Sequence, residues 1–422
     1  MTLIDRLSPR ISSTAPSPSP ADAGEIRSAV ALLLLATVAC YVPTTLYPAY
    51  QDLFGFDDLV LMVIYAAMSI CAAPALLLFG QAADALGRRL VILSGIALVA
   101  LGTACFLVAT GPAWLIAGRI VQGIALAAVT AGGTALIIER TPPERRARAS
   151  FVVTAAFVGG SVAGNLVSGL VAEYIPRPRH TAFVLLLALL TVLWFRARRI
   201  RPTPAMGLRE WRPVRPEVPR EIRTRFALAV ASASTAWLAV TLFLSVIPAL
   251  LARSAGVTGA AVIGLVLAAM LACSLVTQPF VLRVSTERLQ RVGLPLLAVA
   301  LIGLAIDRGE SSAITLACAV VAGLGHGVAY GGATASIDEV TTERNRGSVN
   351  AAFYLFAYLA TGTPAVLVGL LSTRIPLDAA LATIAWCGVA AAVLTISGFA
   401  VVGGRARLAR LAFDGRPDAG GS

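Results

Sequence analysis

Long runs of apolar residues, separated by short polar connections, follow one another along the whole chain. Most of these runs reach the roughly 20 residues that a helix needs to cross a bilayer. The pattern therefore predicts an all-α membrane protein with twelve transmembrane helices. We expect these helices at residues 28–50, 59–82, 90–109, 113–138, 149–173, 181–198, 226–252, 259–282, 292–307, 312–337, 348–373 and 379–402.

The composition supports a membrane protein. Of the 422 residues, 58% are hydrophobic and 13% are charged, whereas soluble domains average about 25% charged residues. The six cysteines fall inside apolar runs without paired spacing. They are therefore interpreted as small packing residues, and we expect no disulfide framework, no metal site and no cofactor.

The positive charge indicates how the chain lies in the membrane. The net charge is +12, and every basic residue is an arginine. A basic protein can bind nucleic acid, but these arginines lie between apolar runs, where they orient a membrane protein. We expect no nucleic-acid partner. Most arginines fall in the two tails and on one set of connections, which places both termini in the cytoplasm. The opposite connections hold only Arg177, Arg179, Arg253, Arg308 and Arg374.

Polar segments divide the chain. Residues 1–27 form a Ser/Pro-rich tail, expected to be disordered and cytoplasmic, and residues 403–422 form a second cytoplasmic tail. An Arg/Pro-rich linker at 199–225 separates two six-helix bundles, 28–198 and 226–402. The linker arginines either lie against anionic lipid headgroups or are simply solvated.

A short internal repeat relates the two halves. Gly132-Gly-Thr-Ala, followed by Glu144-Arg, recurs as Gly331-Gly-Ala-Thr, followed by Glu343-Arg, at the same offset. Convergence between two loops could explain so short a match. It also agrees with parallel repeats, an arrangement that places the substrate site at the membrane midplane between the halves.

The connection between the second and third runs carries a specific motif, Gly80-Gln-Ala-Ala-Asp-Ala-Leu-Gly-Arg-Arg89. Its glycines permit close approach or a tight turn, and its arginine pair favours the cytoplasmic side. The motif resembles the loop 2–3 signature of the major facilitator superfamily. The resemblance implies two pseudo-symmetric six-helix bundles and a conformational switch in which Asp84 contacts the start of the eleventh helix near residues 346–348. The switch residues would be Gly80, Asp84, Gly87, Arg88 and Arg89.

Arg119 is the one arginine in the interior of a predicted span. A guanidinium at the centre of a lone membrane helix costs about 3 kcal/mol, so it should face a wet cavity or a partner. Arg119-Ile-Val-Gln-Gly123 resembles the Arg-x-x-Gln-Gly signature of span 4 in this superfamily, where the position is linked to proton movement. Gln122 shares its helix face. A purely structural arginine bound to carbonyls is the alternative.

The fifth run contains Gly160-Ser-Val-Ala-Gly-Asn-Leu-Val-Ser-Gly169. This run is similar to the antiporter signature Gly-x-x-x-Gly-Pro-x-x-Gly-Gly, with Asn165 in place of the proline and Ser168 in place of a glycine. Small residues at this spacing also allow two helices to pack closely, with no further role. The resemblance is greatest to the twelve-span drug/proton antiporter group.

Polar and aromatic residues recur at helical spacing on the first, seventh, tenth and eleventh runs. On a lipid-facing surface the polar groups of such residues would have no hydrogen-bond partners, so we expect these residues to face a shared interior. Hydrogen bonding between helices is the alternative for each residue taken singly. The candidate substrate contacts are Tyr41, Thr44, Thr45, Gln122, Asn165, Trp237, Thr241, Tyr330, Asn350 and Tyr354.

The sequence gives less evidence for the coupling ion than for the substrate contacts. The carboxylates all fall near span ends, and His326 is the one group near mid-span with an ordinary pKa near 6.5. If protons drive transport, the candidates are His326, or Asp52 acting with Arg119. His326 could equally be a hydrogen-bonded packing residue.

These patterns predict a secondary transporter. Without lysine there is no P-loop, and no hydrolase constellation is present, so we expect no catalytic residues and no enzyme. We expect a monomer in a bacterial plasma membrane that exports a small, partly hydrophobic molecule in exchange for protons. Uptake or facilitated diffusion of a metabolite is the second hypothesis, and a non-transporting sensor or scaffold is the third.

Overall fold

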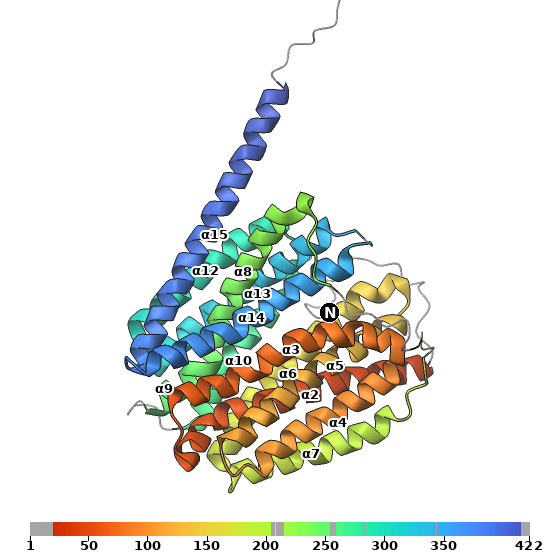
Figure 1. The fold of residues 1–422 in the computed structure, drawn as a ribbon, viewed down its shortest axis with the longest axis vertical. Coiled ribbons are helices and arrows are strands. Elements are labelled where there is room, and N and C mark those ends of the chain that lie inside the picture. The colour runs from red at the N-terminus through yellow and green to blue at the C-terminus, as the bar shows by residue number, and fades with distance from the viewer. Residues whose placement is uncertain are drawn as a thin grey trace, which may run out of the picture.

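The computed structural model describes residues 20–203, 207, 215–253, 259–281, 283–342 and 344–414. In this part of the chain every regular element is a helix (Figure 1). Twelve of the described helical segments are long and apolar enough to cross a membrane, which confirms the twelve predicted spans. The predicted tail residues 1–19 and 415–422, and linker residues 204–206 and 208–214, lie outside the described residues.

The first six spans pack into one bundle. Within it α3 and α4 both pack on α5, α2 packs on α6, and α4 packs on α7. A short 3-10 turn, η1, connects α5 to α6. The elements are α2 Pro20–Phe54, α3 Asp58–Leu86, α4 Arg88–Leu107, α5 Pro112–Glu139, η1 Pro143–Arg145, α6 Arg146–Tyr174 and α7 Pro178–Ala197.

The last six spans repeat this arrangement. Here α10 and α12 both pack on α13, α8 packs on α14, and α12 packs on α15. The seventh span changes to a π-helical turn, η3, in its middle, a feature often found at functional sites. The elements are η2 Arg220–Ile222, α8 Arg223–Thr241, η3 Leu242–Val246, α9 Ile247–Arg253, α10 Ala260–Val276, α11 Gln278–Val281, α12 Thr286–Asp307, α13 Ser312–Val340, α14 Arg346–Ser372 and α15 Leu377–Asp414.

The two bundles meet through two equivalent helix pairs, α3 with α14 and α6 with α10. We name the two ends of the molecule by the helix ends they contain. The termini face holds Pro20, Leu86 and Glu139, and the opposite face holds Tyr174 and Arg253. In Figure 1 the ribbons of the two bundles lie together near α9 and diverge toward the termini face.

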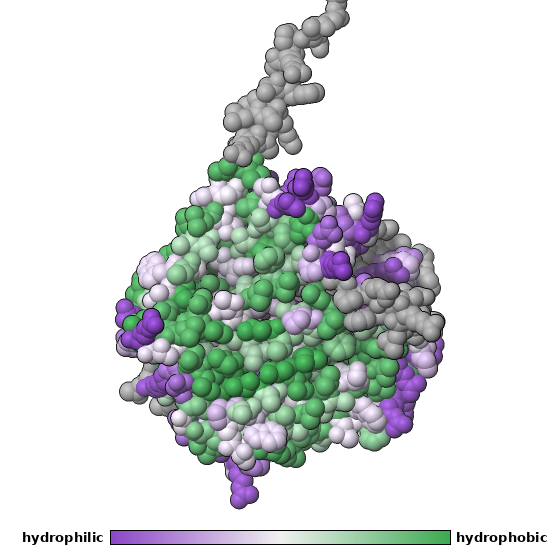
Figure 2. Space-filling view, viewed as in Figure 1, coloured by the Kyte–Doolittle hydropathy of each residue, from purple (hydrophilic) through white to green (hydrophobic). Residues whose placement is uncertain are grey.

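The outer surface is suited to lipid. Large apolar side chains point outward along the helices, among them Leu185, Val192 and Leu394, which are 55%, 60% and 72% exposed. Figure 2 shows a broad hydrophobic face with hydrophilic residues gathered toward its edges. An apolar surface this extensive requires a membrane or a partner to cover it.

Two helix ends differ from the sequence-based expectation. α2 begins at Pro20, so residues 20–27, expected to be disordered, are helical. Proline is favoured in a first helical turn, and Asp22 there interacts well with the helix dipole. α3 continues through Leu86, so most of the 80–89 motif is helical and Gly87 alone separates α3 from α4.

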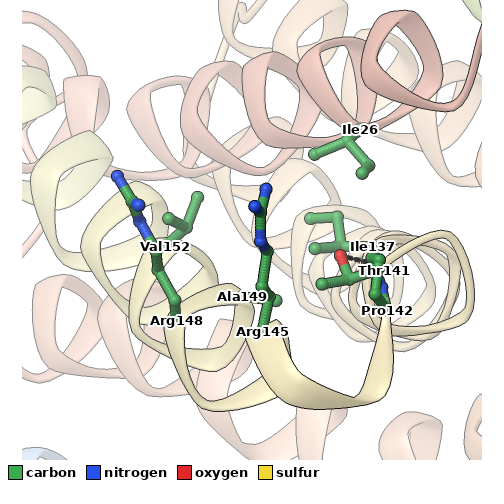
Figure 3. A pocket seen from close by; sticks show the side chains of 8 residues that line it. All are labelled: Ile26, Ile137, Thr141, Pro142, Arg145, Arg148, Ala149 and Val152. Carbon is green, nitrogen blue, oxygen red and sulfur yellow. Dashed lines mark hydrogen bonds between the residues drawn. The ribbon is translucent and has the colours of Figure 1, made fainter. Parts of the chain in front are cut away.

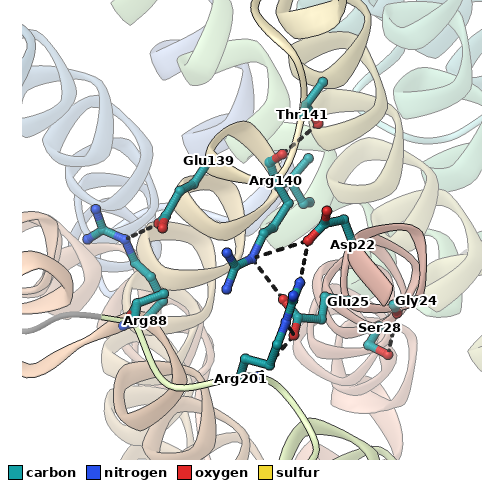
Figure 4. A network of polar contacts seen from close by, with 11 residues as sticks. Asp22, Gly24, Glu25, Ser28, Arg88, Glu139, Arg140, Thr141 and Arg201 are labelled. Carbon is teal, nitrogen blue, oxygen red and sulfur yellow. Dashed lines mark hydrogen bonds and ion pairs between the residues drawn. The ribbon is translucent and has the colours of Figure 1, made fainter. Parts of the chain in front are cut away.

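A charged network explains the early start of α2 (Figure 4). Arg140, at the end of α5, donates to Glu25 at 2.8 Å, and Arg201 of the linker donates to Glu25 at 2.8 Å and also to Asp22. The hydrogen bonds that Arg201 donates to Glu25 and Asp22 raise the pKa of Arg201 above its ordinary value. The network fastens the start of the linker to the first bundle.

Candidate functional site

Arg119 is buried in the first bundle, with 1% of its surface exposed. Its guanidinium donates to the Tyr47 hydroxyl, to the Cys40 carbonyl oxygen, and to Gln122 Oε1 at 3.0 Å. The guanidinium carbon also lies 5.1 Å from the centre of the Tyr47 ring. These hydrogen-bond partners are dipoles rather than carboxylates, and they join α5 to α2.

The other predicted partners of Arg119 are placed differently. Gln122 is fully buried, and its Nε2 donates to the Ala39 carbonyl oxygen at 3.3 Å, so both of its polar ends are engaged inside the first bundle. Asp52 is exposed at the end of α2, and its charge acts on Arg253. The structure therefore does not bring Asp52 to Arg119, nor Gln122 to the space between the bundles.

The second bundle carries a cluster of rings from three helices. Trp237 of α8 lies edge-on to His326, at 5.1 Å between ring centres, and edge-on to Tyr330, at 5.5 Å. His326 and Tyr330 of α13 are stacked at 5.4 Å. The ring of Tyr330 also stacks on that of Phe353 of α14, at 6.4 Å between ring centres, and the rings of Phe353 and Tyr354 are 5.7 Å apart between centres. We call these five residues the ring cluster.

His326 is the polar centre of the ring cluster. It is 6% exposed, and its Nδ1 lies 2.8 Å from the Ser274 hydroxyl of α10. Its Nε2 is buried and has no hydrogen-bond partner in the described structure. An unpaired buried nitrogen costs roughly 1–3 kcal/mol, which a bound solute could recover. The sequence analysis did not identify Ser274 or Phe353. No sequence pattern distinguishes Ser274, whereas Phe353 could have been found because it directly precedes the predicted contact Tyr354.

The candidate contacts on α2 and α6 face each other. Thr45 donates to the Ser168 hydroxyl, and Ser168 donates in turn to the Val42 carbonyl oxygen. Asn165 Nδ2 donates to the Ser161 carbonyl oxygen at 2.9 Å, while its Oδ1 is buried without a partner. Tyr41 and Thr44 of α2 are buried as well.

The remaining candidates lie on α8 and α14. Thr241 donates to the Thr361 carbonyl oxygen at 2.9 Å, so its hydroxyl links two helices of the second bundle. Asn350 and Tyr354 of α14 are half-buried. Of the predicted substrate contacts, Trp237, Tyr330 and Tyr354 belong to the ring cluster. Thr241 and Asn350 have no aromatic ring and are not part of it.

Small residues bring the bundles into close contact near the opposite face. A methyl group at Gly169 of α6 would lie 2.7 Å from the Ala260 carbonyl oxygen of α10, and one at Gly264 would lie 2.6 Å from the Asn165 carbonyl oxygen. On the earlier part of α6, Gly160 and Gly164 pack instead against α2. The predicted small-residue motif therefore serves two different helix contacts.

A charged bridge joins the bundles at the same face. Arg253, at the end of α9, donates through Nη1 to Asp58 Oδ2 at 3.0 Å and through Nη2 to Gln51 Oε1 at 3.2 Å. Gln51 also donates to Asp58 at 2.9 Å. A polar pocket of about 410 Å³ lies beside this bridge, lined by residues of α2 and α9 that include Asp52 and Ala249. We call Arg253, Asp58 and Gln51 the bridge.

The turn between α3 and α4 contacts the linker. Gly87 has φ +86°, a conformation that favours glycine. The Arg88 backbone N–H donates to Thr203 Oγ1 at 2.9 Å, and the Arg88 side chain pairs with Glu139 at 3.6 Å, as Figure 4 shows. Arg89 is half-buried. Gly80 and Asp84 lie in the helical part of α3, and the surroundings of the Asp84 side chain are not described, so the contact expected at residues 346–348 stays a prediction.

The family model described as Major Facilitator Superfamily matches residues 29–364. The puromycin resistance protein Pur8 of Streptomyces alboniger is 32% identical over 147 residues, 35% of this chain and 29% of that protein. The cephamycin export protein CmcT of Amycolatopsis lactamdurans is 33% identical over 135 residues, 32% of this chain and 28% of that protein. These matches thus cover less than a third of each relative's length.

Two solved structures share the fold. A bacterial homolog of the human lysosomal transporter Spinster, in an inward-facing and occupied conformation, aligns with TM-score 0.68 at 16% identity, covering 91% of this chain and 97% of that one. A POT family transporter in complex with 5-aminolevulinic acid aligns with TM-score 0.72 at 11% identity, covering 93% and 98%.

Proposed function

The chain belongs to the major facilitator superfamily, and from that premise we propose that it exports a small, partly hydrophobic molecule in exchange for protons. As a member of this family the protein is a multi-pass membrane transporter and not an enzyme. The cargo, the direction and the coupling ion are the parts that we propose.

The ring cluster is the observation that carries the proposal. Trp237 and Tyr330 pack against one imidazole, whose Nε2 has no hydrogen-bond partner among the described residues. Phe353 and Tyr354 of α14 extend the aromatic wall from Tyr330. Binding sites for small molecules combine apolar and aromatic walls with a few polar groups that fix orientation. Planar, partly apolar solutes bearing one hydrogen-bonding group suit such walls better than sugars, which need many polar partners.

The packing of the bundles supports alternating access. The bridge and the contact between Gly169 and Ala260 both lie toward the opposite face. The half-buried rings of Trp237 and Tyr330 lie deeper along their helices. We therefore interpret the conformation as closed at the opposite face and open toward the termini face, so that a solute would enter from the termini face.

Arginine placement and the relatives support the direction. The termini face carries most of the arginines, which favours its location in the cytoplasm of a bacterial cell, with both ends of the chain there. Two relatives are a puromycin resistance protein and a cephamycin export protein. Entry from the cytoplasm followed by opening of the opposite face would carry a solute outward.

Everted membrane vesicles test the proposal directly. Their interior corresponds to the cell exterior, so an acidic interior should drive accumulation of an exported solute, with puromycin and tetracycline as first probes. We expect accumulation that collapses when the pH gradient is dissipated. Accumulation only in right-side-out vesicles with an acidic exterior would favour the uptake hypothesis instead.

The ring cluster has a matched control for the same assay. Trp237→Leu removes the central indole, whereas Trp386→Leu removes an indole of α15 that is 49% exposed. We expect the KM for the transported probe to rise about tenfold in the first variant, because stacking on one aromatic side chain contributes roughly 0.5–1.5 kcal/mol beyond its buried area. Equal KM values in the two variants would place the solute elsewhere.

A further inference from the structure

The middle of the second bundle contains two irregular helix segments that pack against each other. The seventh span changes to the π-helical turn η3 directly after Thr241, and all five residues of η3 are buried. In α14, Pro364 is buried inside the helix. Proline has no N–H to donate to the carbonyl oxygen four residues earlier, so it interrupts the hydrogen bonds of its helix. Helices bend most readily at such prolines and at π-helical turns.

One hydrogen bond joins the two irregular segments. Thr241 Oγ1 donates to the Thr361 carbonyl oxygen at 2.9 Å, within one turn of Pro364, and both threonines are buried. The carbonyl oxygen of Thr241 in turn accepts a hydrogen bond from Ser245 Oγ of η3 at 2.7 Å. The seventh span is therefore tied to α14 at the level where each of them can bend.

The same region touches the first bundle. A methyl group at Gly362, next to Thr361, would lie 2.7 Å from Ile70 Cγ1 of α3, so the glycine permits the close approach of α14 to α3. The turn η3 packs against α3 as well. We call Thr241, η3, Thr361 and Pro364 the joint. A change of angle at the joint would alter how the second bundle packs on α3.

The joint lies between the ring cluster and the bridge. Trp237 of the ring cluster is about one turn before Thr241 along the seventh span. Phe353 of the same cluster is about three turns before Pro364 along α14. Arg253 of the bridge is on the other side of the joint, at the end of α9. Bending at the joint would therefore move these rings relative to the bridge.

We propose that the joint is the hinge at which the second bundle bends, and that the hydrogen bond from Thr241 to Thr361 favours the conformation closed at the opposite face. The bond is made in the observed conformation, and bending would separate the two spans that it joins. Thr241 is then a positioning residue and not a contact for the solute. This role rests on the alternating access proposed above, because the protein needs a hinge only if the opposite face opens.

The reactivity of one introduced cysteine tests the hinge in protein reconstituted in nanodiscs. The reporter is Cys at Ala249, a buried position beside the polar pocket at the opposite face, in a background without the native cysteines. In Thr241→Val it should react about fivefold faster with an impermeant maleimide, because one buried hydrogen bond no longer favours the closed conformation. Thr241→Ser keeps the hydroxyl and should react as the wild type. Thr235→Val is the matched control, because Thr235 donates within its own helix, to the Ala231 carbonyl oxygen at 2.9 Å.

Pro364→Ala gives the opposite expectation. Alanine supplies the N–H that can donate to the Ala360 carbonyl oxygen, so α14 should become stiffer and the reporter at residue 249 should react about fivefold more slowly. A second reporter, Cys at Ala149, controls for general loosening of the fold. Ala149 lines a pocket of about 210 Å³ whose wall comes from the first bundle (Figure 3). Its reaction rate should be the same in every variant.

Several results would overturn the hinge. Equal rates at residue 249 in Thr241→Val and the wild type would show that the hydrogen bond does not favour the closed conformation. An unaltered or faster rate in Pro364→Ala would do the same, even where Thr241→Val folds poorly. A parallel increase at residue 149 would indicate loosening of the whole fold. These rates report conformation and not transport, so vesicles that accumulate no probe would contradict the transport proposal and not these results.

Discussion

At the scale of single residues, two buried polar side chains distinguish the two bundles. Arg119 donates to α2 and to Gln122, whereas one ring nitrogen of His326 has no hydrogen-bond partner among the described residues. A buried polar group with all its hydrogen bonds made stabilises the fold, whereas a buried polar group that lacks a hydrogen-bond partner is available to a ligand or a proton. We therefore expect Arg119 to matter mainly for stability and His326 mainly for transport.

The role of His326 can be tested by His326→Gln, which keeps a polar side chain but does not titrate. We expect this variant to lose accumulation driven by a pH gradient, because glutamine cannot take up the proton, while it keeps gradient-independent exchange of labelled for unlabelled solute. Proteoliposome flux measures both. His180→Gln changes the exposed second histidine and should leave both unaltered. Full gradient-driven accumulation in His326→Gln would remove this residue from proton coupling.

Arg119→Lys keeps the charge but loses the planar fork that reaches three partners. Each buried hydrogen bond lost without replacement costs roughly 1–3 kcal/mol, so we expect a clearly lower thermal unfolding temperature in detergent. Arg225→Lys, at an exposed position of α8, is the control. Unfolding at the wild-type temperature would show that the Arg119 contacts add little to stability.

How much of the site could be predicted depended on where its partners lie in the chain. Arg119 and His326 were identified because a charged or titratable group inside an apolar run is unusual. Their partners could not be: Tyr47 is 72 residues from Arg119, and Ser274 is 52 residues from His326. Such contacts form only when separate helices pack, so they cannot be predicted from the local sequence around either residue.

At the scale of helices, length and hydropathy predicted all twelve spans, because a bilayer fixes the length of an apolar helix. The start of α2 could not be predicted in the same way. Its first turns follow a Pro/Ser-rich tail and are held by Arg140 and Arg201, 115 and 176 residues away from Glu25. The extension of α3 beyond residue 82 to Leu86 was missed because the helix continues through a polar sequence, whereas a tight turn at a glycine of the motif was expected.

The crossing of α6 and α10 yields a prediction about an element. Gly169→Ala would place a methyl group 2.7 Å from a backbone oxygen, whereas a methyl group at Gly159 of the same helix meets nothing within 4 Å. Overpacking costs typically 1–3 kcal/mol, so we expect Gly169→Ala to reduce the transport rate about tenfold by forcing the bundles apart. Gly159→Ala should transport at the wild-type rate. Equal rates in the two variants would contradict close packing of α6 on α10.

At the scale of the whole molecule, the bridge joins the two bundles at the opposite face. Its Arg253 side chain is 47% exposed, and exposed ion pairs contribute about 0–1 kcal/mol, so the bridge can shift the balance of two conformations without locking either. Equivalent packing of helices in the two bundles gives the fold the symmetry that a rocking motion needs.

Arg253→Gln should therefore favour opening at the opposite face. We expect Cys introduced at Ala249, a buried residue of the adjacent pocket, to react several times faster with an impermeant maleimide, in a background without the native cysteines. Arg374→Gln, exposed at the same face, should not change the rate. An unaltered rate in Arg253→Gln would exclude a gating role for the bridge.

We propose that the two bundles rock about a site between them, opening one face as they close the other. Double electron–electron resonance can follow both faces, with spin labels at Leu53 and Ile306 on the opposite face and at Ser150 and Thr342 on the termini face, all exposed positions. If the bundles rock, adding the transported solute should lengthen the distance between labels 53 and 306 and shorten the distance between labels 150 and 342. Distances that stay fixed, or that change in the same direction, would contradict it.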